Sequence, residues 1–457
     1  MAVFAVTAVA GLAGATSTAP GTPPGSPAPG GTASNAAATT PLDGLIQRPD
    51  GYEARPAPKP DEPEALHSAG SCELSDPLLN WSALPRHLRA VPLHKKIGQL
   101  LVVSYSGKTP DARGVAIARE ALENSEIGGL LTFRHNIGSA SDVRAINEVF
   151  ASAHPYLPAI VAVDQEGGAV MRVKPSEGGP PTPSARDVAK GSADDAADTY
   201  RAMAEALADL GFTVNFGPVV DLEVNPKNPV IARFGRAFGA EPETVLAFAR
   251  AFIDAHHDAG VATALKHFPG HGSSRADSHE GAIDLTPTWS REELIPFERL
   301  IEEGRSDMVM IGHLELDGVS GPDDLPASLS PIAIDGVLRR GLCFEGLVVS
   351  DDLAMDAIEN RWGSPEATRL MIEAGGDIAL VSLPAGKGME LVREITDYLV
   401  EAAEASPDLR RKIEEAYVRI VHFKHQQANA AGSADRAKSD QKNATDVAAG
   451  VPANAAE

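Results

Sequence analysis

The sequence is poor in cysteine and in long apolar runs. It has two cysteines, Cys72 and Cys343, and no CxxC or Cys/His spacing pattern that would offer a structural zinc site. They lie far apart in the chain, so the sequence leaves open whether they pair. No stretch of about 20 apolar residues is present, and no membrane span is therefore expected. No G-x-G-x-x-G motif follows a predicted strand, so a dinucleotide-binding site has no support.

Basic residues are also in short supply relative to acidic ones. The 40 Lys and Arg residues and 63 Asp and Glu residues give a formal net charge of −23 at pH 7. This excess of negative charge opposes binding to nucleic acid or to an anionic membrane. The hydrophobic share of 43% and the charged share of 23% are typical of a globular protein with a sizeable core.

The two ends of the chain differ in composition from its middle. Residues 4–12 form a short apolar run followed by small residues, as in an export signal that lacks its positively charged start. The following segment is rich in Pro, Gly, Ala, Ser and Thr and predicts a disordered linker. We therefore predict an N-terminal extension over 1–75, a folded domain over 76–425 and a disordered tail over 426–457. The export signal predicts a secreted or envelope protein, with a cytoplasmic one as the alternative.

Strand-like and helix-like segments alternate through the predicted domain. Eight strands are predicted at 99–104, 128–133, 159–164, 213–216, 263–266, 308–312, 347–350 and 377–381. Helices are predicted between them, among others at 142–153, 194–210, 242–259, 291–303 and 389–405. This alternation indicates parallel βα units. Eight such units predict an α/β protein with a single TIM-type (β/α)₈ barrel, and an open doubly wound sheet is the alternative.

Polar residues follow several of these strands at the point where each strand ends. Asp164 closes the third predicted strand, Lys266 and His267 close the fifth, His313 the sixth and Asp351 the seventh. In (β/α)₈ barrels the catalytic groups lie at the C-terminal ends of the strands. We therefore expect these side chains to share one site.

The segment 266–279 gathers Lys266, three histidines and an aspartate in one loop. Its histidines could bind zinc or could simply form hydrogen bonds to the backbone. A more specific interpretation pairs Asp277 with His279. In that pair, the aspartate fixes the tautomer of the imidazole and His279 transfers protons.

The remaining polar groups suit a ligand with many hydroxyls. Asp164 can accept hydrogen bonds from sugar hydroxyls, and Lys266 and Arg172 can donate to others. Asp351 has three possible roles, because an aspartate there can attack an electrophilic carbon, bind a metal or cap the next helix.

The motifs around these residues resemble those of family 3 glycoside hydrolases, in the single-domain bacterial β-N-acetylhexosaminidase branch that recycles peptidoglycan. The specific segments are DQEGGAVMR at 164–172, KHFPGHG at 266–272 with DSH at 277–279, and SDDLAM at 350–355. Supporting segments are NFGPVVD at 215–221, NPVI at 228–231 and PASLS at 326–330. The resemblance extends over about residues 90–425.

This resemblance implies a retaining enzyme that works through a covalent glycosyl-aspartate. It would release terminal β-linked N-acetylglucosamine from peptidoglycan fragments or chitooligosaccharides. Asp351 would be the nucleophile, and His279 would be the acid/base, paired with Asp277. The resemblance implies a monomer that acts on an amino-sugar or muropeptide substrate and needs no metal and no organic cofactor.

The resemblance also implies a set of residues that contact the N-acetylglucosamine. They are Asp164, Arg172, Lys266, His267 and the arginine ahead of a Phe-Gly pair, Arg236. The segment after Ile231 is slightly longer than the usual pattern, so Arg233 competes with Arg236 for that last role.

Other functions remain open at this point. A β-N-acetylglucosaminide phosphorylase and a β-glucosidase are the alternatives within the family. A catalytically inactive sugar-binding envelope protein is the alternative of a different class. It is disfavoured because the predicted nucleophile and both members of the predicted dyad are present.

Overall fold

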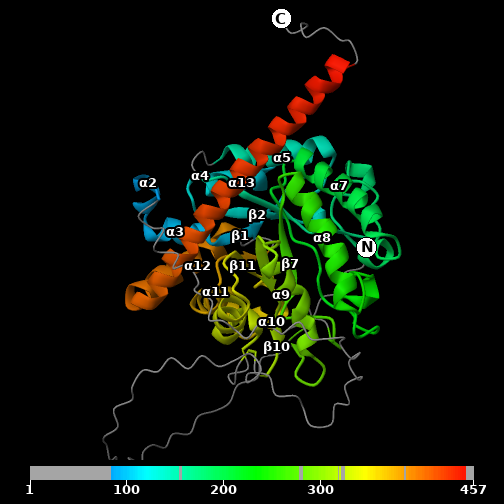
Figure 1. The fold of residues 1–457 in the computed structure, drawn as a ribbon. Coiled ribbons are helices and arrows are strands. Elements are labelled where there is room, and N and C mark those ends of the chain that lie inside the picture. The colour runs from blue at the N-terminus through cyan, green and yellow to red at the C-terminus, as the bar shows by residue number, and fades with distance from the viewer. Residues whose placement is uncertain are drawn as a thin grey trace, which may run out of the picture. The chain divides into compact units, whose positions relative to one another are not determined.

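The computed structural model describes residues 84–153, 157–276, 281, 283–317, 319–320, 325–384 and 388–448, all within one compact unit (Figure 1). Eight parallel strands form its main sheet. They are β1 (Leu101–Ser104), β2 (Gly129–Thr132), β3 (Ile160–Val163), β6 (Val214–Asn215), β7 (Ala262–Phe268), β9 (Met308–Ile311), β11 (Leu347–Ser350) and β12 (Ala379–Val381). Each coincides with one of the predicted strands.

The sheet closes into a barrel. The strand order is β11-β9-β7-β6-β3-β2-β1-β12, so neighbours in the sheet follow chain order. The two ends meet where Val349 forms a parallel bridge with Ile378, and the Ser350 amide donates to the Ile378 carbonyl at 2.9 Å. The predicted (β/α)₈ barrel is confirmed, and the doubly wound alternative is excluded because its strand order would reverse.

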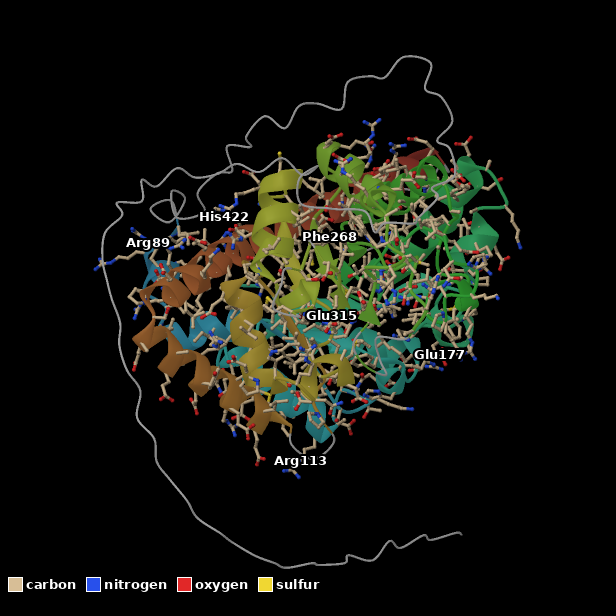
Figure 2. The ribbon with its side chains drawn as sticks, turned by 90° about the horizontal axis from the view of Figure 1, so that it is seen from below. Arg89, Arg113, Glu177, Phe268, Glu315 and His422 are labelled. Atoms are coloured by element: carbon tan, nitrogen blue, oxygen red, sulfur yellow. The ribbon has the colours of Figure 1, made fainter. Side chains whose placement is uncertain are left out.

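Most of the strands are short apolar runs, and all eight are buried throughout, as expected for parallel strands covered on both faces. Phe268, the last residue of β7, lies in the interior, whereas Arg113 points outward at the edge of the molecule (Figure 2).

Helices lie outside the strands (Figure 1). They include α4 (Arg113–Glu123), α5 (Ala140–Ser152), α7 (Ala193–Asp209), α8 (Pro242–Asp258), α9 (Ile295–Glu302), η7 (Ile332–Gly341), α11 (Gly363–Glu373) and α12 (Met389–Ala405). Local sequence explains several boundaries. Ser139 and Ser192 cap α5 and α7 by accepting from the third amide of each helix, and Gly211, at φ 83°, ends α7. The predicted helix 291–303 is divided into η5 (Arg291–Leu294) and α9.

The last helix, α13 (Pro407–Ala448), is longer than the composition predicts. Its N-terminal part packs on the barrel through buried residues such as Ile413, Tyr417 and Val421. It then continues as a helix through 426–448, which were predicted to be a disordered tail. That segment has seven alanines among its 23 residues, and alanine has the highest helix propensity, so it extends a helix that is already nucleated by packing.

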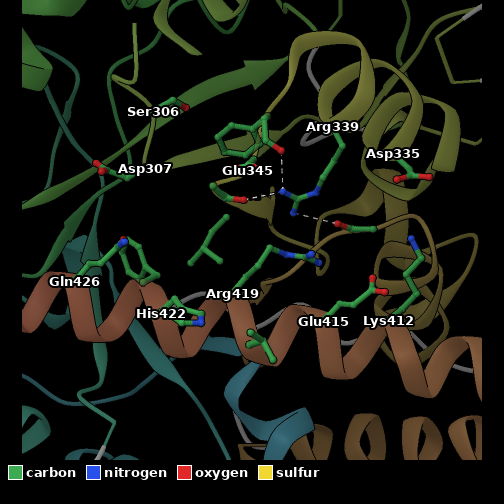
Figure 3. Close-up of a pocket in the computed structure, with 16 residues that line it drawn as sticks. Ser306, Asp307, Asp335, Arg339, Glu345, Lys412, Glu415, Arg419, His422 and Gln426 are labelled. Carbon is green, nitrogen blue, oxygen red and sulfur yellow. Dashed lines mark hydrogen bonds between the residues drawn. The ribbon is translucent and has the colours of Figure 1, made fainter. Parts of the chain in front are cut away.

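A cavity of about 620 Å³ lies where the strands begin, between β9, β11 and α13 (Figure 3). Behind it, buried Asp377 joins two arginines. Arg339 donates to one carboxylate oxygen at 2.5 Å, and Arg419 donates to the other at 2.7 Å. Arg339 also donates to the carbonyls of Phe344 and Gly346. These bonds join η7 and α13 to the start of β12, which indicates a structural role.

Cys343 lies two residues after the end of η7 and is disulfide-bonded. Cys72, the other cysteine of the chain, lies outside the described residues. In the part of the chain that the structure covers, no helix combines the length and the apolar character needed to cross a membrane.

Candidate active site

The C-terminal ends of the strands surround a cavity of about 330 Å³, within the range of small-ligand sites. Its polar lining consists of Asp164, Glu166, Arg172, Arg236, Lys266, His267, His271, Asp351, Asp352 and Ser382. The predicted residues Asp164, Arg172, Arg236, Lys266, His267 and Asp351 are therefore in this one cavity. The expectation that His313 shares the site is wrong, because His313 does not line the cavity and its ring nitrogens lie 2.7 Å from Ser328 Oγ and 2.9 Å from the Asp352 carbonyl oxygen. Asp277 and His279, the predicted dyad, lie outside the described residues.

A buried lysine organises the floor of the cavity. The Lys266 ammonium lies 2.9 Å from Asp164 Oδ1 and 2.7 Å from Glu166 Oε1, and the Lys266 side chain is 2% exposed. Arg172 reaches Asp164 Oδ2 at 3.3 Å. Burial alone would raise the pKa of Asp164, but the charges of Lys266 and Arg172 outweigh it and lower that pKa. Asp164 is therefore an anion that can accept hydrogen bonds from hydroxyl groups.

A hairpin after β3 positions two of these groups. Strands β4 (Gln165–Gly167) and β5 (Val170–Met171) pair antiparallel. The fully buried Gln165 side chain accepts from the amides of Arg172 and Val173 at 2.8 and 3.0 Å and donates to the Val173 carbonyl. This amide fixes the turn that carries Glu166 and Arg172 into the cavity.

Arg236 forms a bidentate pair with Glu166, with two nitrogen–oxygen distances of 2.8 Å. Burial would raise the pKa of Glu166, yet the charges of Arg236 and Lys266 hold it well below its usual range. Sequence reasoning included Glu166 in the motif at the end of the third strand but assigned it no role. Arg233, the competing arginine, is not part of the cavity lining.

His267 is oriented by Asp221, which is fully buried. Asp221 Oδ2 lies 2.8 Å from His267 Nδ1, and Oδ1 accepts from the amides of His267 and His271 at 3.0 and 2.8 Å. Burial opposes ionisation of Asp221, but the neighbouring histidines lower its pKa, so the carboxylate only accepts. Nδ1 of His267 therefore donates, and Nε2 is left facing Arg236 at 3.4 Å.

Asp351 and Asp352 are adjacent acids in different environments. Asp351 is half-buried, follows β11 directly, and accepts from the Asp352 amide at 2.8 Å. Asp352 accepts from the amides of Ala354 and Ser382, and burial raises its pKa. The N-cap of the next helix, α10 (Asp356–Glu359), is Met355. The helix-cap interpretation of Asp351 is therefore wrong.

The loop after β7 is held by a buried glutamate from η5. Glu293 Oε2 accepts from the amides of Gly272 and Ser273 at 2.8 and 3.3 Å. A Cβ atom at Gly272 would lie 1.6 Å from the Leu222 carbonyl oxygen, which explains why this position is glycine. Nothing in the sequence signals the role of Glu293, because its contacts come from a loop some 20 residues earlier.

The zinc interpretation of the same loop gains no support. Among the described residues, no group of three or more His, Cys, Asp or Glu side chains could hold a metal ion. The rings of His267 and His271 lie 5.8 Å apart, edge to face, and His267 is already bonded to Asp221.

The model of the glycosyl hydrolase family 3 N-terminal domain matches residues 92–423. The chain belongs to glycosyl hydrolase family 3. Within this family it is similar to the beta-hexosaminidase LpqI of Mycobacterium tuberculosis, with 36% identity over 342 residues that cover 72% of this chain and 82% of that protein. It is also 35% identical over 266 residues to the beta-hexosaminidase of Tolumonas auensis, covering 57% of this chain and 77% of that protein.

Solved structures agree with the family assignment. A family 3 β-N-acetylglucosaminidase from a Paenibacillus species superimposes with a TM-score of 0.67 at 32% identity, over 74% of this chain and 63% of that one. A β-N-acetylhexosaminidase from Beutenbergia cavernae does so with a TM-score of 0.65 at 27% identity, over 73% and 99%. The chain thus spans less than two thirds of the first family 3 structure and nearly all of the second.

Proposed function

We propose that this family 3 protein is a retaining β-N-acetylhexosaminidase that releases terminal β-linked N-acetylglucosamine. The observation that carries the proposal is the position of Asp351. Its carboxylate lines the same cavity as the four charged groups Asp164, Arg172, Arg236 and Lys266. The names of the similar proteins, beta-hexosaminidase and β-N-acetylglucosaminidase, support the same activity.

The charged floor suits the recognition of one sugar ring. Asp164 accepts from ring hydroxyls, and Lys266, Arg172 and Arg236 donate to hydroxyl or acetamido oxygens. Their mutual ion pairs hold these groups in place before substrate arrives, so little reorganisation is needed on binding. His267 Nε2, on a ring oriented by Asp221, adds a further polar contact.

The chemistry proceeds by double displacement. Asp351 attacks the anomeric carbon and forms a glycosyl ester, while the leaving oxygen takes a proton from the imidazolium of His279. Neutral His279 then removes a proton from water, and the resulting hydroxide attacks the anomeric carbon and frees Asp351. Asp277 orients the imidazole. The roles of Asp277 and His279 are inferred from the motif they share with the family, and they replace the second carboxylate of most glycosidases.

The first test uses a chromogenic substrate. Purified protein should release nitrophenol from nitrophenyl β-N-acetylglucosaminide, and Asp351→Ala should lower kcat by several orders of magnitude because the nucleophile is lost. A substitution of an exposed acid, Glu390→Gln, serves as the control and should leave the rate unchanged. A wild-type preference for the glucoside would instead indicate a β-glucosidase.

A trapping experiment tests the nucleophile itself. A 2-fluoro or 5-fluoro sugar should label one peptide, and that peptide should contain Asp351. Product analysis with and without phosphate separates hydrolysis from phosphorolysis, since a phosphorylase would form the sugar 1-phosphate. Activity that survives a chelator argues against a metallohydrolase.

We also propose that the natural substrates are muropeptides or chitooligosaccharides, and that the protein is an exported monomer. The disulfide at Cys343 supports an oxidising compartment. Cell fractionation tests the export, and sedimentation tests the monomer. Recovery of the protein in the cytoplasm with a free thiol at Cys343 would contradict the export.

A further inference from the structure

An exposed aromatic ring lies at the mouth of the cavity. Phe234 lines the cavity and is 44% exposed, the highest value among the exposed large hydrophobic residues in the described part of the chain. The floor is far more enclosed, with Lys266 2%, Glu166 6% and Arg236 11% exposed. Exposed aromatic surface beside a ligand cavity marks binding more than packing. Phe234 therefore faces whatever extends outward from a group bound on the floor.

The turn that carries this ring is held from several sides. Phe234 ends the short helix η4 (Ala232–Phe234), and Gly235 follows with φ 63°, in the left-handed region that favours glycine. Arg186 donates to the Ala232 carbonyl and pairs with Glu223 at 2.6 and 2.9 Å. The ring is thus presented by a fixed turn.

Arg233, the residue before it, offers a cation at the same place. Its guanidinium carbon lies 5.3 Å from the centroid of the Phe234 ring. Among the described residues, no side-chain hydrogen bond or ion pair engages this guanidinium, and Arg233 is exposed. A guanidinium stacked near a ring keeps its donors in a planar fork that matches a carboxylate. The two arginines that line the cavity, Arg172 and Arg236, are already paired with carboxylates.

We propose that Phe234 and Arg233 form the subsite for the group that leaves. The Phe234 ring packs against the apolar face of the sugar that follows the scissile bond, and Arg233 binds a carboxylate carried by that sugar. The inference rests on the proposed hydrolase function and refines its substrate. The favoured substrate is an N-acetylglucosamine linked β to an acidic sugar, ahead of a neutral chitooligosaccharide.

The test compares three disaccharides that share the non-reducing N-acetylglucosamine. The reducing sugar carries a carboxylate on an ether substituent in the first, the methyl ester of that carboxylate in the second, and no substituent in the third, chitobiose. Wild-type protein should show the highest kcat/KM on the acid. Arg233→Gln should lower kcat/KM on the acid about tenfold and change the ester and chitobiose less than twofold. Added salt should weaken the preference in the wild type and not in the variant.

Phe234→Ala tests the ring. It should lower kcat/KM about equally on all three disaccharides, because the lost contact is with the face of the reducing sugar, which all three share, and not with the carboxylate, which only the first carries. Inhibition by free N-acetylglucosamine, which occupies the floor, should be unchanged in both variants. Arg113→Gln, an exposed arginine elsewhere on the surface, is the matched control and should leave all values as in the wild type.

The outcomes separate this inference from the proposed function. If wild-type protein hydrolyses none of the three disaccharides or nitrophenyl β-N-acetylglucosaminide, the hydrolase assignment itself fails. If it hydrolyses them but Arg233→Gln affects acid and ester alike, or neither, the assignment stands and the carboxylate subsite is overturned.

Discussion

The residues of the floor are held by charges that depend on one another. Lys266 is shared by Asp164 and Glu166, and Glu166 is shared by Lys266 and Arg236. Such a network orders the groups that meet substrate, but a buried charge that loses its partner is costly. Function and stability are therefore coupled at these positions.

Replacing Lys266 by Ala should reveal this coupling. The change leaves Asp164 and Glu166 close together with one cation fewer, so we expect a loss of about 3 kcal/mol in the free energy of unfolding. Urea denaturation measures it. Lys190→Ala is the control, because Lys190 pairs with Asp187 on the surface at 71% and 53% exposure, where no measurable loss is expected. A similar effect of the two changes would contradict the network.

Asp221 should act through His267. In the wild type, the Asp221 carboxylate accepts from His267 Nδ1–H and from the backbone amides of His267 and His271. Asp221→Asn removes the negative charge, so the tautomer of the His267 imidazole is no longer fixed. We expect kcat/KM on nitrophenyl β-N-acetylglucosaminide to fall about 10- to 100-fold, by analogy with partners that orient metal-bound histidines. The pH profile should shift as well.

His257→Gln provides the comparison for Asp221. His257 pairs with Asp307 at 2.7 Å where the strands begin, far from the cavity lining. Like the pair of His267 and Asp221, this pair joins a histidine to an aspartate, but it does not contact the site. Loss of the His257–Asp307 pair should therefore leave the pH profile of kcat/KM unchanged. An unchanged profile in Asp221→Asn would show that Asp221 serves the fold alone.

At the scale of elements, mostly apolar runs were enough to locate the eight strands, and the C-terminal ends of these runs were enough to locate Asp164, Lys266 and Asp351. Both signals are local. Asp221 and Glu293 acquire their roles from partners in other segments, and such contacts leave no pattern in the sequence. The division of the predicted helix 291–303 into η5 and α9 has the same kind of cause. Glu293, in η5, accepts a hydrogen bond from the Gly272 amide in the loop after β7, and this contact is not visible in the local sequence.

Glu293 should make stability depend on pH. Burial raises its pKa to about 8, while an unfolded glutamate has a pKa near 4.3. Between these values the folded state binds more protons than the unfolded state. The contribution is present in full below the lower value and is lost as the pH rises through about 8.

Glu293→Gln keeps an oxygen for the amides of Gly272 and Ser273 but cannot ionise. Its advantage over wild type in the free energy of unfolding should therefore grow from pH 5 to pH 8, as measured by urea denaturation at each pH. Glu415→Gln, at a buried acid on α13 that pairs with Arg411, is the control for replacing a buried glutamate by glutamine. A constant difference between Glu293→Gln and wild type would contradict a raised pKa.

At the scale of the whole molecule, the barrel was predictable because eight similar units repeat one pattern. The end of the chain was not, because apolar content marks packing but does not mark where a helix stops. Within 407–430, the part of α13 whose side chains the structure describes, the last buried residues are Phe423 and Lys424, and the helix continues to Ala448. The buried side chain of Lys424 contacts Gln99 and the Gly128 carbonyl.

Buried Lys424 should make the stability of the protein depend on pH above neutrality. Its ammonium donates to Gln99 Oε1 at 2.8 Å and to the Gly128 carbonyl at 2.7 Å, and among the described residues no carboxylate forms an ion pair with it. Burial lowers its pKa to about 7, below the value near 10.4 of an unfolded lysine. The unfolded state therefore binds more protons between pH 7 and about 10, so the wild-type protein should gain stability across that range.

Lys424→Met, which fills the site without a charge, should lack this gain and should be the more stable protein at pH 6. Urea denaturation at pH 6, 8 and 9.5 measures both, with exposed Lys190→Met as the control. A variant that is less stable than wild type at pH 6 would show that the two hydrogen bonds outweigh the cost of the buried charge.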